Sequence, residues 1–314
     1  MNQQHIPVML NEVLEIFEPV SDMVLIDGTL GMAGHSKAIL EKAYSHNSSN
    51  NGSKVQLFGF DRDPESLKLA EQNLLEEKKN PCFSINLINQ RFSKIPDFVP
   101  HSLLGTDLKY SKKVILLDLG ISSFQLDEAS YGLNFSKEAR ELPLDMRLDE
   151  WCQNSASEIL NTWPEQKIAD MFWDYADYLP ARKLAKAIVQ NRPILTLGEI
   201  IELCFKMPHR SKIHPATLPL MALRIAVNEE FSELESGLEK IIEWMEPDTI
   251  LAVISFHSGE DRIVKNIFKK HKDVLKLITP KPLTPTKDEI RKNSRARSAK
   301  LRAACKISHT LKKY

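Results

Sequence analysis

The sequence lacks the features that mark membrane-spanning, secreted and zinc-ribbon proteins. No uninterrupted apolar run approaches the ~18 residues of a membrane span. The N-terminal residues do not show the basic-then-apolar pattern of a signal peptide. The four cysteines lie far apart and form no Cys-x-x-Cys pair, which excludes a zinc ribbon and disfavours a disulfide scaffold. Cysteines of this kind suit a reducing cytoplasm, and without an apolar span we expect no membrane partner. The histidines show no metal-ligand spacing, so we expect no bound metal.

A net charge of zero conceals an uneven distribution of charge. Residues 287–314 carry ten Lys or Arg and two acids, which leaves 32 basic and 40 acidic residues in the rest of the chain. A basic tail on an acidic body can contact a polyanion. The alternative is a solvated terminus without a partner.

The length of 314 residues suggests about two domains, at roughly 150 residues each. Strand patterns alternate with helical patterns in the first part of the chain, which predicts a parallel sheet of βαβ units. A polar stretch at residues 45–53 is expected to form a loop. The predicted strands cover residues 23–27, 55–60, 85–92, 113–120 and 249–256, with an edge strand near 274–280.

The middle of the chain has helix signals and no convincing strand. Ser155 with Glu158, and Thr196 with Glu199, have the spacing of capping boxes, and Pro164 can open a helix. We therefore predict an inserted helical domain. Its expected bounds are 127–215, within a discontinuous domain formed by 1–126 and 216–314.

A glycine-rich turn follows the first predicted strand, with the sequence DGTLGMAGH at residues 27–35. Glycines every third residue permit a positive φ and a close approach of the backbone, and the next helix offers N–H groups to an anion. The spacing G-x-x-G-x-x-G differs from the dinucleotide pattern G-x-G-x-x-G, which weakens a nicotinamide hypothesis. The alternative is a tight turn that binds nothing.

Two carboxylates end the next strands of the predicted sheet. Asp61 can accept hydrogen bonds from both ribose hydroxyls of an adenosine, although it could also cap a helix. The neighbouring Asp63-Pro64 suits the cap better. Asp118 follows a very apolar strand and is expected beside the reactive end of a cofactor, whereas the alternative is a surface turn.

Other polar residues near the predicted sheet edge and the insertion are candidates for substrate contacts. Asp145 could read the edge of a nucleic-acid base and Arg147 could take a phosphate, or the two could form a local salt bridge. His257 follows the fifth strand, where it could be catalytic or structural.

The ordered motifs DGTLGMAGHS, FDRDP, RFS, LLDLGISSFQLD, PLDMRLD, SFHSGEDRIVK and NSRARSAKLR resemble one bacterial family. Its members methylate N4 of a cytosine in 16S ribosomal RNA, in the decoding region at position 1402. The match runs from His5 to about Arg302, nearly the whole chain.

The resemblance implies an α/β fold, namely the Rossmann-like sheet of class I S-adenosylmethionine-dependent methyltransferases, with an inserted all-helical domain for RNA recognition. It implies S-adenosyl-L-methionine as cofactor and 16S rRNA, within the small ribosomal subunit, as partner, and it admits a homodimer. The implied cofactor contacts are Ala33, Gly34, His35, Asp61, Phe92, Asp118 and Gln125.

We assign catalytic roles to Asp118, Ser122, Asp145 and His257, because the poorly nucleophilic N4 amine needs a hydrogen-bond acceptor and must lose a proton. RNA contacts are expected at Arg147, Arg291, Arg295, Arg297, Lys300 and Arg302. If the last five lie on one helix, Arg291, Arg295 and Arg302 share a face.

The sequence departs from the family pattern at five positions. The family usually has Gly at Ala33, Pro at Phe124, Gly at Leu142, Arg at Leu218 and Leu at Gly259. Two alternative functions stay open at this stage, a nicotinamide-dependent oxidoreductase and a non-catalytic RNA-binding factor in ribosome assembly.

Overall fold

The computed structural model describes residues 7–45, 54–103, 112–128, 131, 137–208 and 213–307. The chain forms two compact units, one of Met1–Gly120 with Ser232–Tyr314 and one of Ile121–Phe231. Within the described ranges, no helix is both long enough and apolar enough to cross a membrane. Apart from Ser45, the predicted polar loop at residues 45–53 lies outside the described residues.

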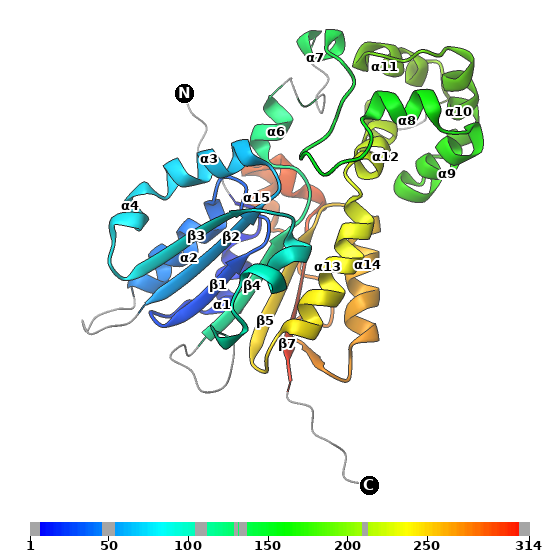
Figure 1. The fold of residues 1–314 in the computed structure, drawn as a ribbon. Coiled ribbons are helices and arrows are strands. Elements are labelled where there is room, and N and C mark those ends of the chain that lie inside the picture. Colours follow the sequence, from blue (N-terminus) through cyan, green and yellow to red (C-terminus); the bar gives the residue numbers. More distant parts are fainter. Residues whose placement is uncertain are drawn as a thin grey trace. The chain divides into compact units, whose positions relative to one another are not determined.

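The first unit is built on a seven-stranded sheet in the order β3-β2-β1-β4-β5-β7-β6. The central pairs are parallel, whereas β7 runs antiparallel to both β5 and β6. This confirms the predicted Rossmann-like class I sheet (Figure 1). The strands are β1 (Met23–Asp27), β2 (Val55–Asp61), β3 (Phe83–Asn89), β4 (Lys112–Asp118), β5 (Thr249–Ser255), β6 (Leu275–Leu277) and β7 (Lys300–Lys306).

The apolar runs predicted as strands form the interior of this sheet. All five residues of β1 and the middle five of β4 are buried, as expected for parallel strands that are covered on both faces. The helices of this unit are α1 (Leu10–Phe17), α2 (Gly34–Ser45), α3 (Pro64–Asn73), α4 (Leu75–Lys79), α5 (Ile95–Phe98), α13 (Glu230–Trp244), α14 (Ser258–Lys270) and α15 (Lys287–Lys292), with short 3-10 turns η1 (Phe92–Lys94), η2 (His101–Leu103) and η4 (Ser294–Ser298).

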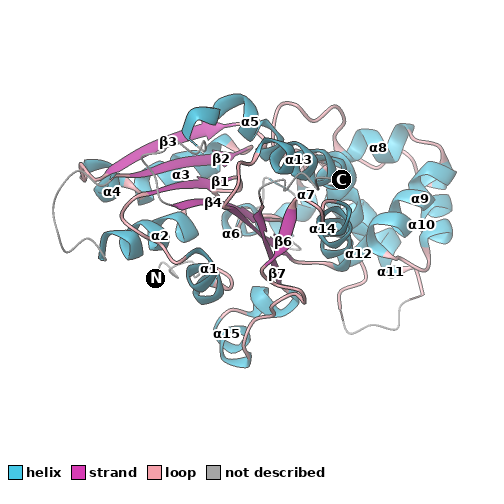
Figure 2. Cartoon of the chain, turned by 90° about the horizontal axis from the view of Figure 1, so that it is seen from below, coloured by secondary structure: helices cyan, strands magenta, loops and turns pink. Residues whose placement is uncertain are grey.

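The basic C-terminal segment is not one helix, so the shared face of Arg291, Arg295 and Arg302 is wrong. The segment consists of α15, η4 and then β7, which pairs with β5 inside the sheet (Figure 2). The physical reason is alternation. Leu301 and Ala303 are buried and lie two residues apart, as on one face of a strand.

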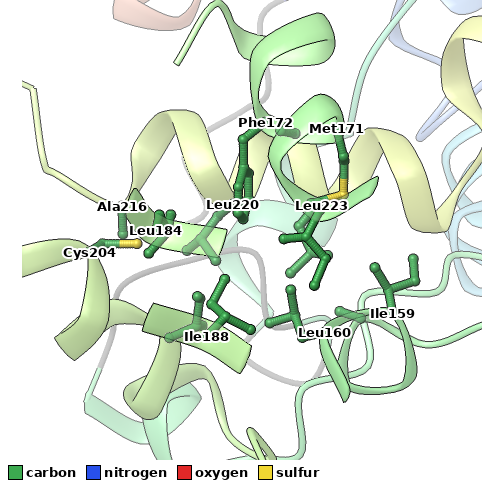
Figure 3. Packing of buried hydrophobic residues seen from close by; sticks show 14 of the residues in the cluster. Ile159, Leu160, Met171, Phe172, Leu184, Ile188, Cys204, Ala216, Leu220 and Leu223 are labelled. Carbon is green, nitrogen blue, oxygen red and sulfur yellow. The ribbon is translucent and has the colours of Figure 1, made fainter. Parts of the chain in front are cut away.

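The described residues of the second unit form helices and no strand, as predicted. Side chains from α8 to α12 converge on one apolar core, in which Phe172, Leu184 and Leu223 are fully buried (Figure 3). Both predicted capping boxes of this unit are present. The helices are α6 (Ser123–Asp127), α7 (Lys137–Glu141), α8 (Ala156–Thr162), α9 (Glu165–Ala176), α10 (Ala181–Gln190), α11 (Leu197–Phe205) and α12 (Thr217–Val227).

The helical unit spans 121–231, whereas the sequence predicts an insertion of 127–215. The difference at the C-terminal side is α12, whose Leu220, Leu223 and Val227 belong to the helical core. The sequence shows that α12 has apolar residues to bury, but it does not show which of the two hydrophobic cores they pack into.

Candidate active site

The glycine-rich loop after β1 is shaped by close packing and by two residues with positive φ. A Cβ at Gly28 would lie 2.4 Å from Leu117 Cδ2 and 3.0 Å from Phe92 Cβ, so only glycine fits there without a shift. Gly31 has φ 51° and the buried Ala33 has φ 65°. Ala33 therefore holds a left-handed conformation, which favours glycine.

The loop uses its own N–H groups to hold its shape. The Leu30 N–H donates to Phe60 O (2.8 Å), and the Ala33 N–H donates to Leu30 O (2.7 Å). The Gly31 N–H donates to Asp61 Oδ2 (2.7 Å). The loop is thus fastened to the end of β2, and these N–H groups are not available to an anion.

Asp61 at the end of β2 is oriented by backbone donors. Its Oδ1 accepts from the Asp63 N–H at 2.9 Å, and its Oδ2 accepts from Gly31. Each carboxylate oxygen retains a second lone pair for a ribose hydroxyl. Burial raises the pKa of Asp61 to about 6, against the hydrogen bonds from Asp63 and Gly31 and together with the charges of Asp63 and Asp27. As predicted, Asp63 is the cap of α3.

Asp118 ends β4 and is not part of a surface turn. Its N–H donates to Thr29 Oγ1 at 2.6 Å, which ties β4 to the glycine loop. Its Oδ1 is buried and has no hydrogen-bond partner among the described residues. Burial, followed by the charges of Asp27 and Glu260, raises the pKa of Asp118 well above its usual value.

The sheet order explains why these acids influence one another. Asp61, Asp27 and Asp118 end β2, β1 and β4, which are neighbours in the sheet. Asp27 is buried in the middle, where its carboxylate accepts from Ser36 Oγ (2.6 Å) and the Thr29 N–H (3.2 Å). Burial raises the pKa of Asp27 to about 6, although both hydrogen bonds oppose the shift. The sequence-based prediction missed this central carboxylate.

His35, in the first turn of α2, is held by the protein at both ring nitrogens. Its Nε2 lies 2.9 Å from Val8 O, and its Nδ1 lies 3.5 Å from Asp118 Oδ2. The ring is nearly buried, with 7% of the side chain exposed. A cofactor contact by His35 stays a prediction, but the observed contacts fix the ring beside Asp118.

Phe92 is the first residue of η1, and its side chain packs closely against Gly28 of the glycine-rich loop. A Cβ added at Gly237 of α13 would meet Phe92 Cε2 at 2.4 Å, and one at Gly28 would meet its Cβ. The neighbouring Ser93 N–H donates to Glu233 Oε1 at 2.9 Å. Phe92 is partly exposed, so its predicted contact with the cofactor stays open to test.

His257 begins α14 in a capping arrangement with Glu260. The Glu260 N–H lies 3.4 Å from His257 Nδ1, and Glu260 Oε2 accepts from the Phe256 N–H at 2.7 Å. His257 Nε2 lies 3.2 Å from Glu260 Oε1. This geometry gives His257 a structural role at the helix start, and a catalytic role stays a prediction.

Two of the predicted RNA-binding residues face the protein. Arg302 Nε donates to Asp261 Oδ1 at 2.7 Å, and Lys300 Nζ donates to Asp261 Oδ2 at 3.1 Å. Both belong to β7 and are held by α14, so their observed partner is a carboxylate of the body. Arg295 and Arg297 of η4 are exposed. Arg291, also exposed, pairs with Asp288 on α15.

The predicted residues of the helical unit make local contacts. Ser122 caps α6, accepting from the Gln125 N–H at 3.2 Å, while Gln125 Oε1 accepts from the Ser122 N–H at 2.9 Å. Arg147 donates to both oxygens of Asp145, at 2.7 and 2.8 Å, which is the local salt bridge left open above. The hydrogen bond from Arg147 lowers the pKa of Asp145. Their predicted roles toward cofactor, cytosine and phosphate stay predictions.

The comparisons with known proteins agree across the chain. A model described as the MraW methylase family matches residues 2–307. The "Ribosomal RNA small subunit methyltransferase H" of Fervidobacterium nodosum is 39% identical over 317 residues, covering 98% of each chain. The protein of the same name from Kosmotoga olearia is 38% identical, again covering 98% of each chain. A solved putative rRNA-methylase from Clostridium thermocellum has a TM-score of 0.42 at 10% identity and covers 98% of this chain and 99% of its own, a similarity too low to add to the strand order. This chain belongs to the MraW methylase family.

Proposed function

We propose that this enzyme transfers a methyl group from S-adenosylmethionine to the exocyclic N4 amine of a decoding-region cytosine in 16S ribosomal RNA. The observation that carries the chemistry is Asp118, whose buried Oδ1 has no partner among the described residues at the end of β4. The names of the relatives support ribosomal RNA of the small subunit as the substrate class. An enzyme with this substrate works in the cytoplasm, where ribosomal subunits are assembled.

The residues at the sheet edge fit an adenosine-containing methyl donor. Asp61 has its carboxylate oriented by two backbone N–H groups and suits the ribose hydroxyls. Asp118 suits the reactive end, because a buried oxygen without a partner is costly unless a ligand supplies a donor. The resemblance adds Ala33, Gly34, His35, Phe92 and Gln125 as further contacts. When bound, the cofactor supplies a methyl group that is activated by a sulfonium centre.

The acceptor amine needs help from the protein. The lone pair of cytosine N4 is delocalised into the ring, so the amine becomes a better nucleophile when a hydrogen-bond acceptor orients it. We assign that role to Asp118 Oδ1. As the C–N bond forms and the C–S bond breaks, the N4 proton passes to this oxygen and the amine ends neutral. The fold contributes by holding donor and acceptor in line and excluding water.

RNA affinity is assigned to exposed cations and to the helical unit. Arg291, Arg295 and Arg297 are exposed on α15 and η4 and can neutralise phosphates. Arg147 could join them by exchanging Asp145 for a phosphate. Homodimer formation is compatible with this assignment and is testable by light scattering.

The test is methyl transfer with labelled S-adenosylmethionine, using purified small subunits and naked 16S RNA in parallel, followed by nucleoside mass spectrometry. The expected product is N4-methylcytidine, absent or strongly reduced with Asp118→Asn. Cofactor binding and RNA binding without transfer would instead support a non-catalytic assembly factor. Label in another nucleoside would overturn the assignment of the amine. Membership of a methylase family removes the reason to consider a nicotinamide-dependent enzyme.

A separate test addresses Asp61. Each hydrogen bond to a charged acceptor is worth roughly 1.5–3 kcal/mol, so Asp61→Ala should weaken S-adenosylhomocysteine binding by about tenfold or more in calorimetry. Asp63→Ala is the matched control, since it removes the α3 cap two residues away. It should lower thermal stability and leave the affinity nearly unchanged. An unchanged affinity in Asp61→Ala would remove Asp61 from the site.

A further inference from the structure

Two ionisable side chains, His35 of α2 and Asp118 of β4, meet at the proposed reaction centre. His35 Nδ1 lies 3.5 Å from Asp118 Oδ2, while the other carboxylate oxygen, Oδ1, is buried without a partner among the described residues. One oxygen is therefore turned to the histidine, and the other is left for a donor from outside. We propose that His35 is a positioning residue that shares the proton of Asp118 and thereby sets the pH range in which Asp118 can accept the proton of the amine. This inference rests on the function proposed above.

The contact with Val8 decides the tautomer of His35. A backbone carbonyl only accepts hydrogen bonds, so the nitrogen 2.9 Å from Val8 O, Nε2, must carry a hydrogen. In the neutral ring Nδ1 is then unprotonated and presents a lone pair to Asp118 Oδ2. A lone pair facing an ionised carboxylate is unfavourable, and one proton placed between them turns the contact into an attraction. The pair is thus built to hold one proton.

The charges around Asp118 make this partner important. Asp27 from β1 and Glu260 from α14 both disfavour the ionised form of Asp118, and burial acts in the same direction, so the pKa of Asp118 is raised. These neighbours favour the protonated form of Asp118, which cannot accept a proton. Among the residues that the structure describes, His35 is the basic group at ion-pair distance from Asp118. When Nδ1 takes the proton, an imidazolium faces a carboxylate, and Asp118 is restored as an acceptor.

The proton balance of one turnover follows. The methyl carbon leaves sulfur and bonds to N4, and the N4–H bond breaks with its proton passing to Asp118 Oδ1. Asp118 is then protonated while His35 still carries the shared proton on Nδ1, and the imidazolium releases that proton to solvent, so that the pair again holds one proton before the next cycle. The present separation of 3.5 Å is long for a hydrogen bond. Such contacts commonly shorten when the reactants are bound.

Two substitutions separate the two faces of the imidazole. In His35→Gln the amide nitrogen can occupy the place of Nε2 and keep the contact with Val8, whereas the titrating Nδ1 is lost. In His35→Asn the amide can occupy the place of Nδ1, and the contact with Val8 is lost. For His35→Gln we expect S-adenosylhomocysteine affinity within about threefold of the parent by calorimetry, because both ring nitrogens face the protein and the cofactor contact proposed for His35 is left to its main chain, which the substitution keeps.

The pH profile of kcat is the decisive kinetic measurement. In His35→Gln, kcat at pH 7 should fall at least tenfold and recover toward pH 9. The reason is that the acidic limb of the pH profile, where kcat is lost as the pH falls, moves to higher pH by one unit or more. In His35→Asn the amide N–H at the place of Nδ1 can donate to Asp118 Oδ2 and favour the carboxylate, so the acidic limb should be displaced less than in His35→Gln. An equal loss at every pH, or a loss of cofactor affinity that matches the loss of kcat, would overturn the proposal.

A readout without RNA keeps this inference separate from the proposed function. Nitrogen chemical shifts of the His35 ring, followed by NMR against pH in the parent and in Asp118→Asn, report whether the two groups share a proton. We expect the ring to titrate at least one pH unit lower in Asp118→Asn, with Nε2 protonated throughout. An unchanged titration would refute proton sharing even if methylation occurs. A shifted titration together with no N4-methylcytidine would refute the proposed function and leave the pair intact.

Discussion

Replacing Asp261 by Asn should strongly destabilise the protein, because this carboxylate holds β7 to α14. Asp261 accepts from Arg302 at 2.7 Å and from Lys300 at 3.1 Å. The side chains of Asp261 and Arg302 are only 12% and 11% exposed, whereas that of Lys300 is 36% exposed. Breaking a buried ion pair by removing one charge costs about 3–5 kcal/mol, and losing the more exposed ion pair with Lys300 adds 1 kcal/mol or less. Since asparagine keeps the shape and one acceptor, we expect a loss of about 3 kcal/mol.

In a unit of this size, 1 kcal/mol corresponds to about 2–4 °C in Tm. Asp261→Asn should therefore lower Tm by about 6–12 °C in calorimetry. Asp288→Asn is the matched control, because it also removes an aspartate paired with arginine, but that pair with Arg291 is 78% and 77% exposed. Its Tm should stay within about 1 °C of the parent, as for most exposed ion pairs.

The pH dependence gives a second check on the same pair. Burial disfavours ionised Asp261, but the hydrogen bonds from Arg302 and Lys300 outweigh it and hold the pKa of Asp261 below its usual 3.8. A lowered pKa in the folded state means that the stabilisation is present above the unfolded value and is lost as the pH falls through the folded value. The difference in Tm between the parent and Asp261→Asn should hence be largest at neutral pH and disappear in acid. An unchanged Tm in Asp261→Asn, or a difference in Tm that persists in acid, would refute the conclusion that Asp261 holds β7 to α14.

Three further outcomes follow from the site and the tail. Burial raises the pKa values of Asp27 and Asp61 to about 6, and a group that binds its proton more tightly when folded stabilises the protein as the pH falls from about 7 toward 5. The free energy of unfolding, measured with urea, should be higher at pH 5 than at pH 7.5 by about 1 kcal/mol for each of these two groups. In Asp27→Asn this difference between the two pH values should be smaller. Ala33→Gly should change the free energy of unfolding by less than about 1 kcal/mol, because the backbone strain that is relieved offsets the apolar burial that is lost. Ala33→Val should lower the free energy of unfolding by about 2 kcal/mol or more. Replacing Arg295 and Arg297 by Ala should flatten the salt slope of RNA affinity by up to about 2 and leave cofactor affinity unchanged, and a lower Tm with an unchanged slope would assign both to structure.

The parts predicted well from the sequence are those decided by neighbours in the chain. The apolar runs that end at Asp27 and Asp118 could only be buried strands, and the side-chain caps of α8 and α11 depend on residues three apart. Asp63 was correctly separated from Asp61 because Pro64 marks the first turn of a helix. Local chemistry was sufficient in each case.

The parts missed depend on partners that are distant in sequence. The strand Lys300–Lys306 has weak strand propensity and reads as a basic tail until β5 is known to lie beside it. Its alternation, with Leu301 and Ala303 buried, was a usable signal. The contact between His35 and Val8 joins residues 27 apart through a backbone carbonyl, which no side-chain pattern reports.

The acidic edge of the sheet also bears on the choice of ligand. Asp61, Asp27 and Asp118 end three adjacent strands, and burial raises the pKa of each, while the charge of Asp27 adds to the shift at Asp61 and at Asp118. Such an edge costs the folded protein stability unless something positive lies over it. S-adenosylmethionine carries a positive sulfonium, whereas the product that remains after methyl transfer does not. The same carboxylates therefore favour the donor over the spent cofactor, most strongly when they are ionised, and the preference should weaken as the pH falls below about 6. The raised pKa values thus couple donor binding to proton release, at the site where the reaction itself must dispose of a proton.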